Sequence, residues 1–364
     1  MLLYPNPNND RIDFSGIGVI TIYMGDTCNF NCLYCDRDYI KYDIGSQNLR
    51  ASDNNDIFKF MQLAADHAKD LKNISFHGGE PFLYIKRIDR ILDVIAPMFP
   101  DDMLFFITTN GSKVAENEWF FKKWGKQIRL TFSYDFMYQE VNREAVDIEK
   151  VAEMVQKYDS GMLFQFVIPP TREAFNEFSI AEVISTMKRA RCDTLNLIPL
   201  RHHRGKRKFK VLIDDVDLKW FSVDLMRFVQ TLYVQGININ IDGNYDKIDK
   251  NYLENHSKLI LSPDGYIYPE FDYLEYKREE YRTGQWKDKQ ILYRVGDENP
   301  LLLPGCRTCP QKSTCGLKYL YAMFDEEPQG KCIEFYGIID LMVKHLHKLK
   351  QQPTLMHWIG IDER

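Results

Sequence analysis

Short strand-like segments alternate with helical patterns through residues 1–200 of this 364-residue chain. Between them, apolar residues recur at helical spacing, as at Ile88, Ile91, Leu92 and Ile95. Six strand-then-helix units predict a parallel sheet with right-handed crossovers, either curved into an incomplete barrel or open and doubly wound. In both folds, ligand chemistry lies at the C-terminal ends of the strands. The expected strands cover residues 17–23, 73–77, 103–108, 128–133, 162–168 and 194–200.

The placement of the cysteines carries the main functional signal. Seven of the eight cysteines fall into two clusters, at 28, 32 and 35 and at 306, 309, 315 and 332. Neither a signal peptide nor a long apolar run is recognisable, so we expect a cytoplasmic protein with no membrane span. Clustered cysteines in a reducing compartment indicate metal binding rather than disulfides. The net charge of -5 gives no basic excess, so we expect no broad nucleic-acid surface.

Cys28, Cys32 and Cys35 form a loop directly after the first expected strand. Three soft thiolates select zinc, copper(I) or an iron–sulfur cluster. A structural zinc usually takes four protein ligands, whereas three thiolates suit a [4Fe–4S] cubane with one iron open to a further ligand. The alternatives are a zinc knuckle completed from elsewhere in the chain and three ordinary core cysteines.

The spacing C-x3-C-x2-C, with Tyr34 just before the last cysteine, resembles the signature of the radical S-adenosylmethionine (SAM) superfamily. The resemblance implies an α/β fold with a partial (β/α)6 TIM-like barrel. It also implies that the open iron of a [4Fe–4S] cluster binds the amino and carboxylate groups of SAM. Reductive cleavage of SAM then yields methionine and a 5′-deoxyadenosyl radical, and Tyr34 would pack against the adenine.

The next two strand ends resemble further motifs of this superfamily. The second strand runs into Gly78, Gly79, Glu80 and a proline, where glycines let backbone approach a ligand and the acid can accept from an ammonium group. The resemblance implies that this segment binds the methionyl amine, although a tight strand-to-helix turn explains the same residues. Asn110 belongs to a TTNG segment that the family shares, but Asn-Gly is also a common turn dipeptide.

Ser133 ends the fourth expected strand, and Arg143 follows downstream. The family pattern is Ser-Leu-Asp followed by an arginine, and it implies that both residues bind SAM. Here Tyr134 replaces the leucine and the interval is slightly shorter. An arginine can hold the methionyl carboxylate through a two-pronged contact. Cys192 stands alone before the sixth strand and reads as a small buried hydrophobe, with hydrogen-atom donation as the alternative.

The second cluster supplies four thiolates, which by themselves favour a structural zinc. Its arrangement resembles the SPASM/Twitch region of radical SAM peptide-modifying enzymes, which binds auxiliary [4Fe–4S] clusters. A Ser-Pro-Asp-Gly turn at 262–265 extends the resemblance, but Pro269-Glu270 and Tyr319 replace two frequent cysteines. The resemblance therefore implies one auxiliary [4Fe–4S] cluster, which conducts electrons or stabilises its domain. Its ligands would be Cys306, Cys309, Cys315 and Cys332.

The resemblance implies three parts: the barrel over 15–205, a connector with a helix over 206–255, and a small SPASM/Twitch-like domain with a C-terminal helix over 256–350. We expect a radical SAM oxidoreductase that forms a crosslink or thioether in a ribosomally synthesised peptide. Its partners would be a peptide or small protein substrate, an electron donor such as flavodoxin or ferredoxin, and a separate leader-binding protein, since residues 1–16 leave no room for a leader-binding domain. The alternatives are a sulfatase-maturase-like protein, a small-molecule radical oxidase, and a zinc-binding adaptor without catalysis.

Overall fold

The structure is a computed structural model. It describes residues 14, 17–32, 35, 54–168, 175–199, 218–241, 257–263, 265–268, 284–285 and 290–291, together with positions 308, 338, 341, 344, 346 and 348. Within these segments, none of the helices combines the length and the apolar character that a bilayer crossing needs.

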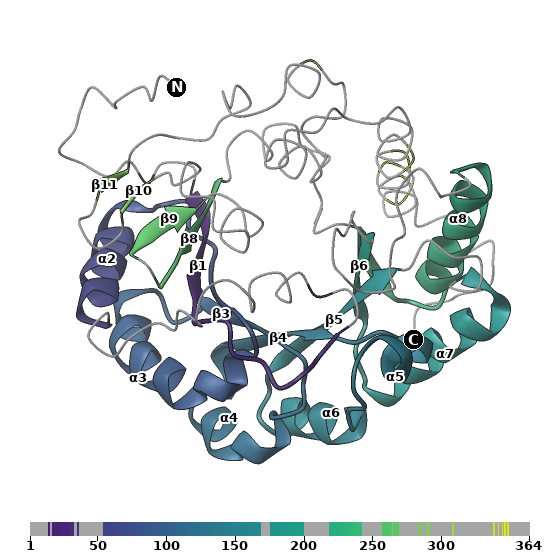
Figure 1. Cartoon of the computed structure of the whole chain (residues 1–364), viewed down its shortest axis with the longest axis horizontal. Helices are drawn as coiled ribbons and strands as arrows, with labels where there is room; N and C mark the ends of the chain where they lie inside the picture. The colour runs from purple at the N-terminus through teal and green to yellow at the C-terminus, as the bar shows by residue number, and fades with distance from the viewer. Residues whose placement is uncertain are drawn as a thin grey trace.

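The centre of the described fold is a curved parallel sheet whose strands follow one another in chain order (Figure 1). Helices lie along the outer, convex side of this sheet, as a partial barrel requires (Figure 1). The predicted α/β partial barrel is therefore confirmed. The parallel strands are β1 (Ile17–Tyr23), β2 (Asn73–His77), β3 (Leu104–Thr109), β4 (Ile128–Ser133), β5 (Gly161–Ile168), β6 (Thr194–Pro199) and β7 (Asn238–Ile241). The outer helices are α2 (Asn54–His67), α3 (Ile85–Ile95), α4 (Glu118–Trp124), α6 (Ile148–Lys157), α7 (Glu177–Arg189) and α8 (Leu218–Val234).

The sheet extends beyond the six expected strands at both edges. On one side, β7 pairs in parallel with β6, so the stretch 206–255 supplies a barrel strand as well as the expected helix. On the other side, β8 (Ser257–Leu261) runs parallel to β1. An antiparallel ribbon of β9 (Tyr266–Tyr268), β10 (Gly284–Gln285) and β11 (Gln290–Ile291) continues from β8.

The turn between β8 and β9 is the hairpin that the sequence predicts. The backbone N–H of Ser262 donates to the carbonyl of Tyr266 at 3.0 Å, and Gly265 N–H donates to the Ser262 carbonyl at 3.1 Å. Gly265 has φ +95°, a left-handed conformation that glycine adopts without steric cost. This hairpin therefore begins on the barrel sheet itself, next to β1.

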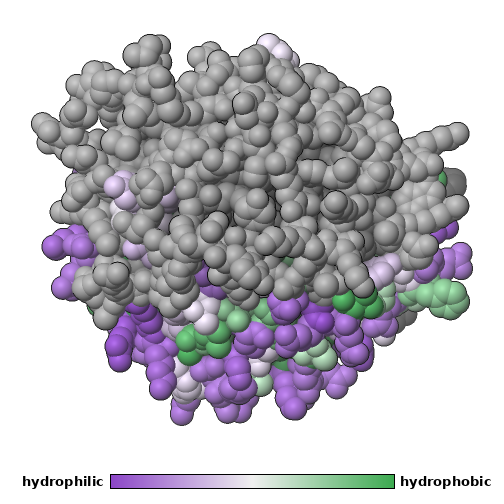
Figure 2. Space-filling view, viewed as in Figure 1, coloured by the Kyte–Doolittle hydropathy of each residue, from purple (hydrophilic) through white to green (hydrophobic). Residues whose placement is uncertain are grey.

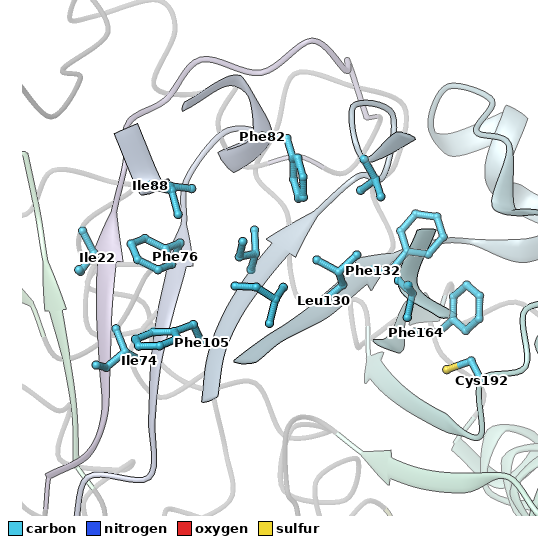
Figure 3. Packing of buried hydrophobic residues seen from close by; sticks show 14 of the residues in the cluster. Ile22, Ile74, Phe76, Phe82, Ile88, Phe105, Leu130, Phe132, Phe164 and Cys192 are labelled. Carbon is cyan, nitrogen blue, oxygen red and sulfur yellow. The ribbon is translucent and has the colours of Figure 1, made fainter. Parts of the chain in front are cut away.

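The hydrophobic core lies between the sheet and the outer helices (Figure 3). Successive strand residues point to opposite faces, so every second residue enters this core. Phe76, Phe105, Leu130, Phe132 and Phe164 are fully buried there. Burying each of these side chains stabilises the fold by about 1.5–3 kcal/mol. The alternate residues face the inner side of the barrel, where the chemistry is expected.

The helices fit this core through their apolar faces. All four isoleucine and leucine residues predicted on one face of α3 are fully buried. Asp147 caps α6 by accepting from the backbone N–H of Lys150, and Asn176 caps α7 by accepting from Ser179 N–H. Along the rim of described residues that is visible in Figure 2, hydrophilic side chains predominate, with hydrophobic ones between them.

Candidate active site

The cysteine loop begins where β1 ends, and main-chain hydrogen bonds tie it to the end of β2. Met24 N–H donates to the His77 carbonyl at 2.8 Å, Gly79 N–H to the Gly25 carbonyl at 2.7 Å, and Glu80 N–H to the Thr27 carbonyl at 2.9 Å. The pairing of β1 with β2 thus continues past both strands to the residue before Cys28. The start of the cysteine loop is therefore fixed by the sheet.

The two glycines of the GGEP segment make this close approach possible. A Cβ on Gly79 would lie 1.9 Å from the carbonyl oxygen of Thr27, and one on Gly78 would lie 2.5 Å from that of Gly25. Gly78 also has φ +144°. The GGEP motif predicts that these glycines make room for a ligand; in the structure, the approaching group is the backbone of the cysteine loop. Contacts of Gly78 and Gly79 with a cofactor stay a prediction.

Glu80 is fully buried and bonds to protein donors. Its Oε1 accepts from Thr109 Oγ1 at 2.7 Å and from Phe82 N–H at 3.0 Å, and its Oε2 accepts from Asn110 N–H at 2.7 Å. The carboxylate therefore caps the short helix η2 (Pro81–Tyr84) and joins the end of β2 to the end of β3. The predicted contact of Glu80 with the methionyl amine is an additional role that stays a prediction.

The three cysteines of the loop influence one another electrostatically. Cys32 is buried, whereas Cys28 and Cys35 are half-buried. Burial raises the pKa of Cys32 to about 11; the guanidinium of Arg143 opposes this rise, and Cys35, Cys28 and Asp135 add to it. Among the residues that the structure describes, no three His, Cys, Asp or Glu side chains form the ligand group of a single metal ion.

Arg143 comes to this loop from the far end of a short helical segment. After β4, the side chain of Gln139 accepts from Asp135 N–H at 2.9 Å and donates to the Glu144 carbonyl at 2.6 Å, which closes the segment into a compact turn. The Arg143 guanidinium carbon lies 6.0 Å from the ring centre of Phe30, which stands between the cysteines in the chain. The structure therefore brings this predicted residue to the cysteine loop.

A row of polar side chains crosses the inner face of the sheet. Ser133, at the end of β4, is opposite Gln165, which is opposite Asn196, which is opposite Asn240. Ser133, Asn196 and Asn240 are buried and Gln165 is half-buried, while their neighbours along the strands enter the hydrophobic core. Strands in a sheet lie about 4.8 Å apart, so this row forms a continuous polar strip. We call residues 133, 165, 196 and 240 the polar row.

Of the polar row, only Ser133 was predicted from the sequence as a site residue. The sequence does contain a signal for these residues. Strands buried on both faces are nearly continuous apolar runs, and Gln165 and Asn196 each interrupt such a run. Polar residues at buried positions are the informative exceptions in a core.

Cys192 packs in the hydrophobic core beside Phe164 (Figure 3). Its Sγ donates to the Met162 carbonyl at 3.2 Å and approaches the Thr194 carbonyl at 3.5 Å. Burial raises the pKa of this thiol to about 11. The arrangement favours the interpretation as a small buried hydrophobe, because the side chain lies in the core at the N-terminal ends of β5 and β6, away from the C-terminal strand ends where the chemistry is expected. Tyr34 and the distal cysteines Cys306, Cys309, Cys315 and Cys332 lie outside the described residues.

Comparison with known proteins agrees with the three-cysteine motif. Residues 22–158 match the radical SAM superfamily. This part of the chain is therefore similar to radical SAM domains. The similarity implies a [4Fe–4S] cluster and SAM as cofactors.

Relatives of known sequence carry a different activity in their names. The GTP 3′,8-cyclase of Nautilia profundicola is 23% identical over 300 residues, which cover 78% of this chain and 91% of that protein. A probable GTP 3′,8-cyclase of Halobacterium salinarum is 32% identical over 102 residues, which cover 28% of this chain and 26% of that protein.

Solved structures show the same fold. The structure of anSMEcpe with bound AdoMet has a TM-score of 0.64 and 17% identity, covering 90% of this chain and 99% of that one. Streptococcus suis SuiB bound to S-adenosylmethionine has a TM-score of 0.62 and 17% identity, covering 87% of this chain and 76% of that one. At this identity the likeness concerns the fold alone.

The donor set of the described site fits the two implied cofactors. Three thiols on one loop are soft ligands of the kind that iron–sulfur clusters take. The neighbouring Arg143 offers a cation for a carboxylate. Both features lie at the C-terminal ends of the barrel strands, where this fold binds ligands.

Proposed function

We propose that this chain is a radical SAM enzyme that oxidatively modifies a side chain of a peptide. In this proposal Cys28, Cys32 and Cys35 hold the catalytic cluster and leave one iron for SAM. Arg143 binds the methionyl carboxylate, and Ser133 and Tyr34 contact the nucleoside part. The residues at the end of β2 and β3 hold the loop in place for these contacts.

The bound cofactors would supply a carbon radical that removes a hydrogen atom from the substrate. The protein's own residues have the remaining tasks of binding, orienting and excluding water. The buried inner face of the barrel suits the last task, because a radical survives only where water and other small molecules are kept away.

The polar row is the observation that carries the choice of a peptide. Each asparagine or glutamine amide offers donors and acceptors together, as does the peptide group that it would bind. Gln165, Asn196 and Asn240, the members of the row that are not assigned to SAM, are uncharged, so they suit a neutral main chain better than a triphosphate, which calls for arginine or lysine. Neighbours of the same fold support the choice, since anSMEcpe has been solved with a Cp18Cys peptide and SuiB with its precursor peptide SuiA.

The distal cysteines support the oxidative character of the proposal. Cys306, Cys309, Cys315 and Cys332 would hold one auxiliary [4Fe–4S] cluster with no open iron. Such a cluster can accept the second electron that a crosslink, a thioether or an aldehyde must lose. The electron donor would be a flavodoxin or ferredoxin, and a separate protein would bind the leader of the peptide.

Metal analysis after anaerobic purification tests the cofactor part of the proposal. We expect about eight irons and about eight sulfides per chain, from two cubanes. Cys32→Ala should abolish reductive cleavage of SAM to 5′-deoxyadenosine and lower the iron content by about half. Cys192→Ala is the matched control and should leave both unchanged, because that thiol lies in the core. Zinc without iron, or retained cleavage in Cys32→Ala, would refute the assignment.

The substrate is tested by co-expression with the short reading frames that neighbour the gene. A peptide that loses two hydrogens in the presence of the enzyme, but not of Cys32→Ala, supports the proposal. Its crosslink or thioether is then located by fragmentation of the peptide in a mass spectrometer.

A second candidate is cyclisation of a nucleoside triphosphate, which the names of the sequence relatives favour. The loaded enzyme is incubated with SAM, a reductant and GTP, and the nucleotides are separated by chromatography. Conversion of GTP in proportion to the 5′-deoxyadenosine formed would replace the peptide proposal with this one. Unchanged GTP would exclude it.

A further inference from the structure

The side chain of Asn110 contacts the cysteine loop directly. Its amide nitrogen Nδ2 donates to Oδ1 of Asn29 at 3.1 Å and to Sγ of Cys28 at 3.9 Å. Its Oδ1 accepts from Ser112 Oγ at 2.7 Å, and Nδ2 of Asn29 donates to the same hydroxyl at 2.9 Å. Asn29, Asn110 and Ser112 thus form a closed ring of side chains between the end of β3 and the cysteine loop.

The orientation of the Asn110 amide follows from one donor. Oxygen and nitrogen of an asparagine side chain must be assigned from their partners. The backbone N–H of Ser112 can only donate, and it lies 3.0 Å from Oδ1 of Asn110. That atom is therefore the oxygen, and the NH2 group faces Asn29 and Cys28.

The backbone of Asn110 is also fixed. Its N–H donates to the buried carboxylate of Glu80. The backbone N–H of Glu80 in turn donates to the Thr27 carbonyl of the cysteine loop. The next residue, Gly111, has φ +80° and packs against the ring of Phe132, which a Cβ would meet at 2.4 Å. The amide is consequently held at Cys28 by the framework of the barrel.

We propose that Asn110 is a positioning residue of the catalytic cluster that raises its reduction potential through the N–H contact with Cys28. The inference rests on the assignment of the cluster to Cys28, Cys32 and Cys35, and it replaces contact with SAM as the main role of Asn110. The backbone N–H of Phe30 is a second donor to the same sulfur, at 3.4 Å.

The physical reason is the charge that reduction adds. Hydrogen bonds to the sulfurs of an iron–sulfur cluster are among the features that set its potential. A donor stabilises the more negative, reduced form more than the oxidised form, so the loss of a donor lowers the potential. For one ordinary hydrogen bond we expect about a fivefold fall in the ratio of reduced to oxidised cluster at a fixed solution potential.

The experiment uses the full chain with its clusters loaded under anaerobic conditions. Asn110→Ala removes the donor, and Asn110→Asp keeps the oxygen that accepts from Ser112 but replaces the donor with a charge. Asn117→Asp is the matched control, because its Nδ2 donates to the Lys113 carbonyl at 2.7 Å and not to a sulfur. Iron content, SAM binding by equilibrium dialysis, and the midpoint potential from a titration followed by electron paramagnetic resonance are measured for each.

We expect a more negative midpoint in Asn110→Ala, a larger shift in Asn110→Asp and no shift in Asn117→Asp. Should both Asn110 variants fail to hold iron, Ser112→Ala provides the test, since it removes the two contacts that the Ser112 hydroxyl makes with Asn110 and Asn29 and leaves the donor in place. That variant should shift the midpoint in the same direction by less. A wild-type midpoint together with weaker SAM binding would overturn the proposal and make Asn110 a cofactor ligand. Absence of iron from the wild-type chain would instead refute the cluster assignment.

Discussion

Replacement of Glu80 by glutamine separates two roles that the GGEP segment can have. In the structure the Glu80 carboxylate is fully buried and accepts from Phe82 N–H, Thr109 Oγ1 and Asn110 N–H. In Glu80→Gln one carboxylate oxygen becomes an NH2 group, which donates and cannot accept. If the NH2 replaces Oε2, it faces the N–H of Asn110. If it replaces Oε1, it faces the N–H of Phe82, so one buried N–H loses its acceptor in either orientation.

The size of the effect follows from these contacts. A buried donor left without an acceptor costs about 1–3 kcal/mol, and the remaining bonds lose the strength that the charge gave them. We therefore expect Glu80→Gln to lower the free energy of unfolding by about 2–4 kcal/mol. The same substitution at Glu116, an exposed partner of Lys113, should change it by less than about 1 kcal/mol.

Urea unfolding of the cluster-loaded enzyme, with and without SAM, measures this difference. Tryptophan fluorescence reports the unfolding, because Trp119 and Trp124 lie on α4 beside the barrel. The predicted loss should be present without SAM, since the bonding partners of Glu80 belong to the protein. Wild-type stability without SAM, combined with weaker SAM binding, would refute this reasoning and make Glu80 a ligand of the cofactor amine.

Further predictions concern glycines and the core thiol. Gly79→Ala should strongly reduce iron loading, measured by metal analysis, because its Cβ would meet the rigid Thr27 carbonyl at 1.9 Å. Gly161→Ala should load iron normally, because the nearest atom, at 2.1 Å, belongs to the flexible side chain of Arg129. Burial raises the pKa of Cys192 from 9.0 to about 11, so its contribution to stability is complete below pH 9 and is lost as the pH rises toward 11. The unfolding free energy of the wild type should therefore fall by up to about 2–3 kcal/mol more than that of Cys192→Ala over this range, and parallel curves would contradict the assignment.

Local sequence patterns predicted the barrel well because each of its repeating units is encoded locally. Strands β1, β2 and β4 have the predicted bounds, β5 and β6 differ by one residue at one end, and β3 is shifted by one residue at both ends. Strand β7 escaped notice because its four residues, Asn-Ile-Asn-Ile, are too few for a clear alternation. The parallel pairing of β8 with β1 joins residues 257–261 to residues 17–22, and no local pattern encodes such a distant partner.

The site was predicted less completely than the fold, for a related reason. Residue types and spacing located the cysteine loop, Glu80, Asn110 and Arg143, and the structure brings all of them to one edge of the sheet. The bonding partner of each side chain could not be predicted from the sequence. A buried acid or amide can bond to a ligand or to the protein, and the residues of the neighbouring strand decide which. The polar row was missed because its members, from β4 to β7, become neighbours only through the sheet register.

The contacts of the cysteine loop explain why three separate sequence motifs occur at three successive strand ends. The loop continues the chain directly from the end of β1. Backbone hydrogen bonds from Gly79 and Glu80 hold its first residues, and the side-chain amide of Asn110 donates to Cys28 and Asn29. Glu80 also connects the end of β2 to the end of β3, since its carboxylate accepts from the backbone N–H of Asn110. The described part of the cysteine loop is thus oriented by the barrel, and a cluster bound there as proposed would have supporting partners outside its ligand set, as many metal sites do. A substitution at any of the three strand ends should accordingly act on the same property, the placement of the three thiolates.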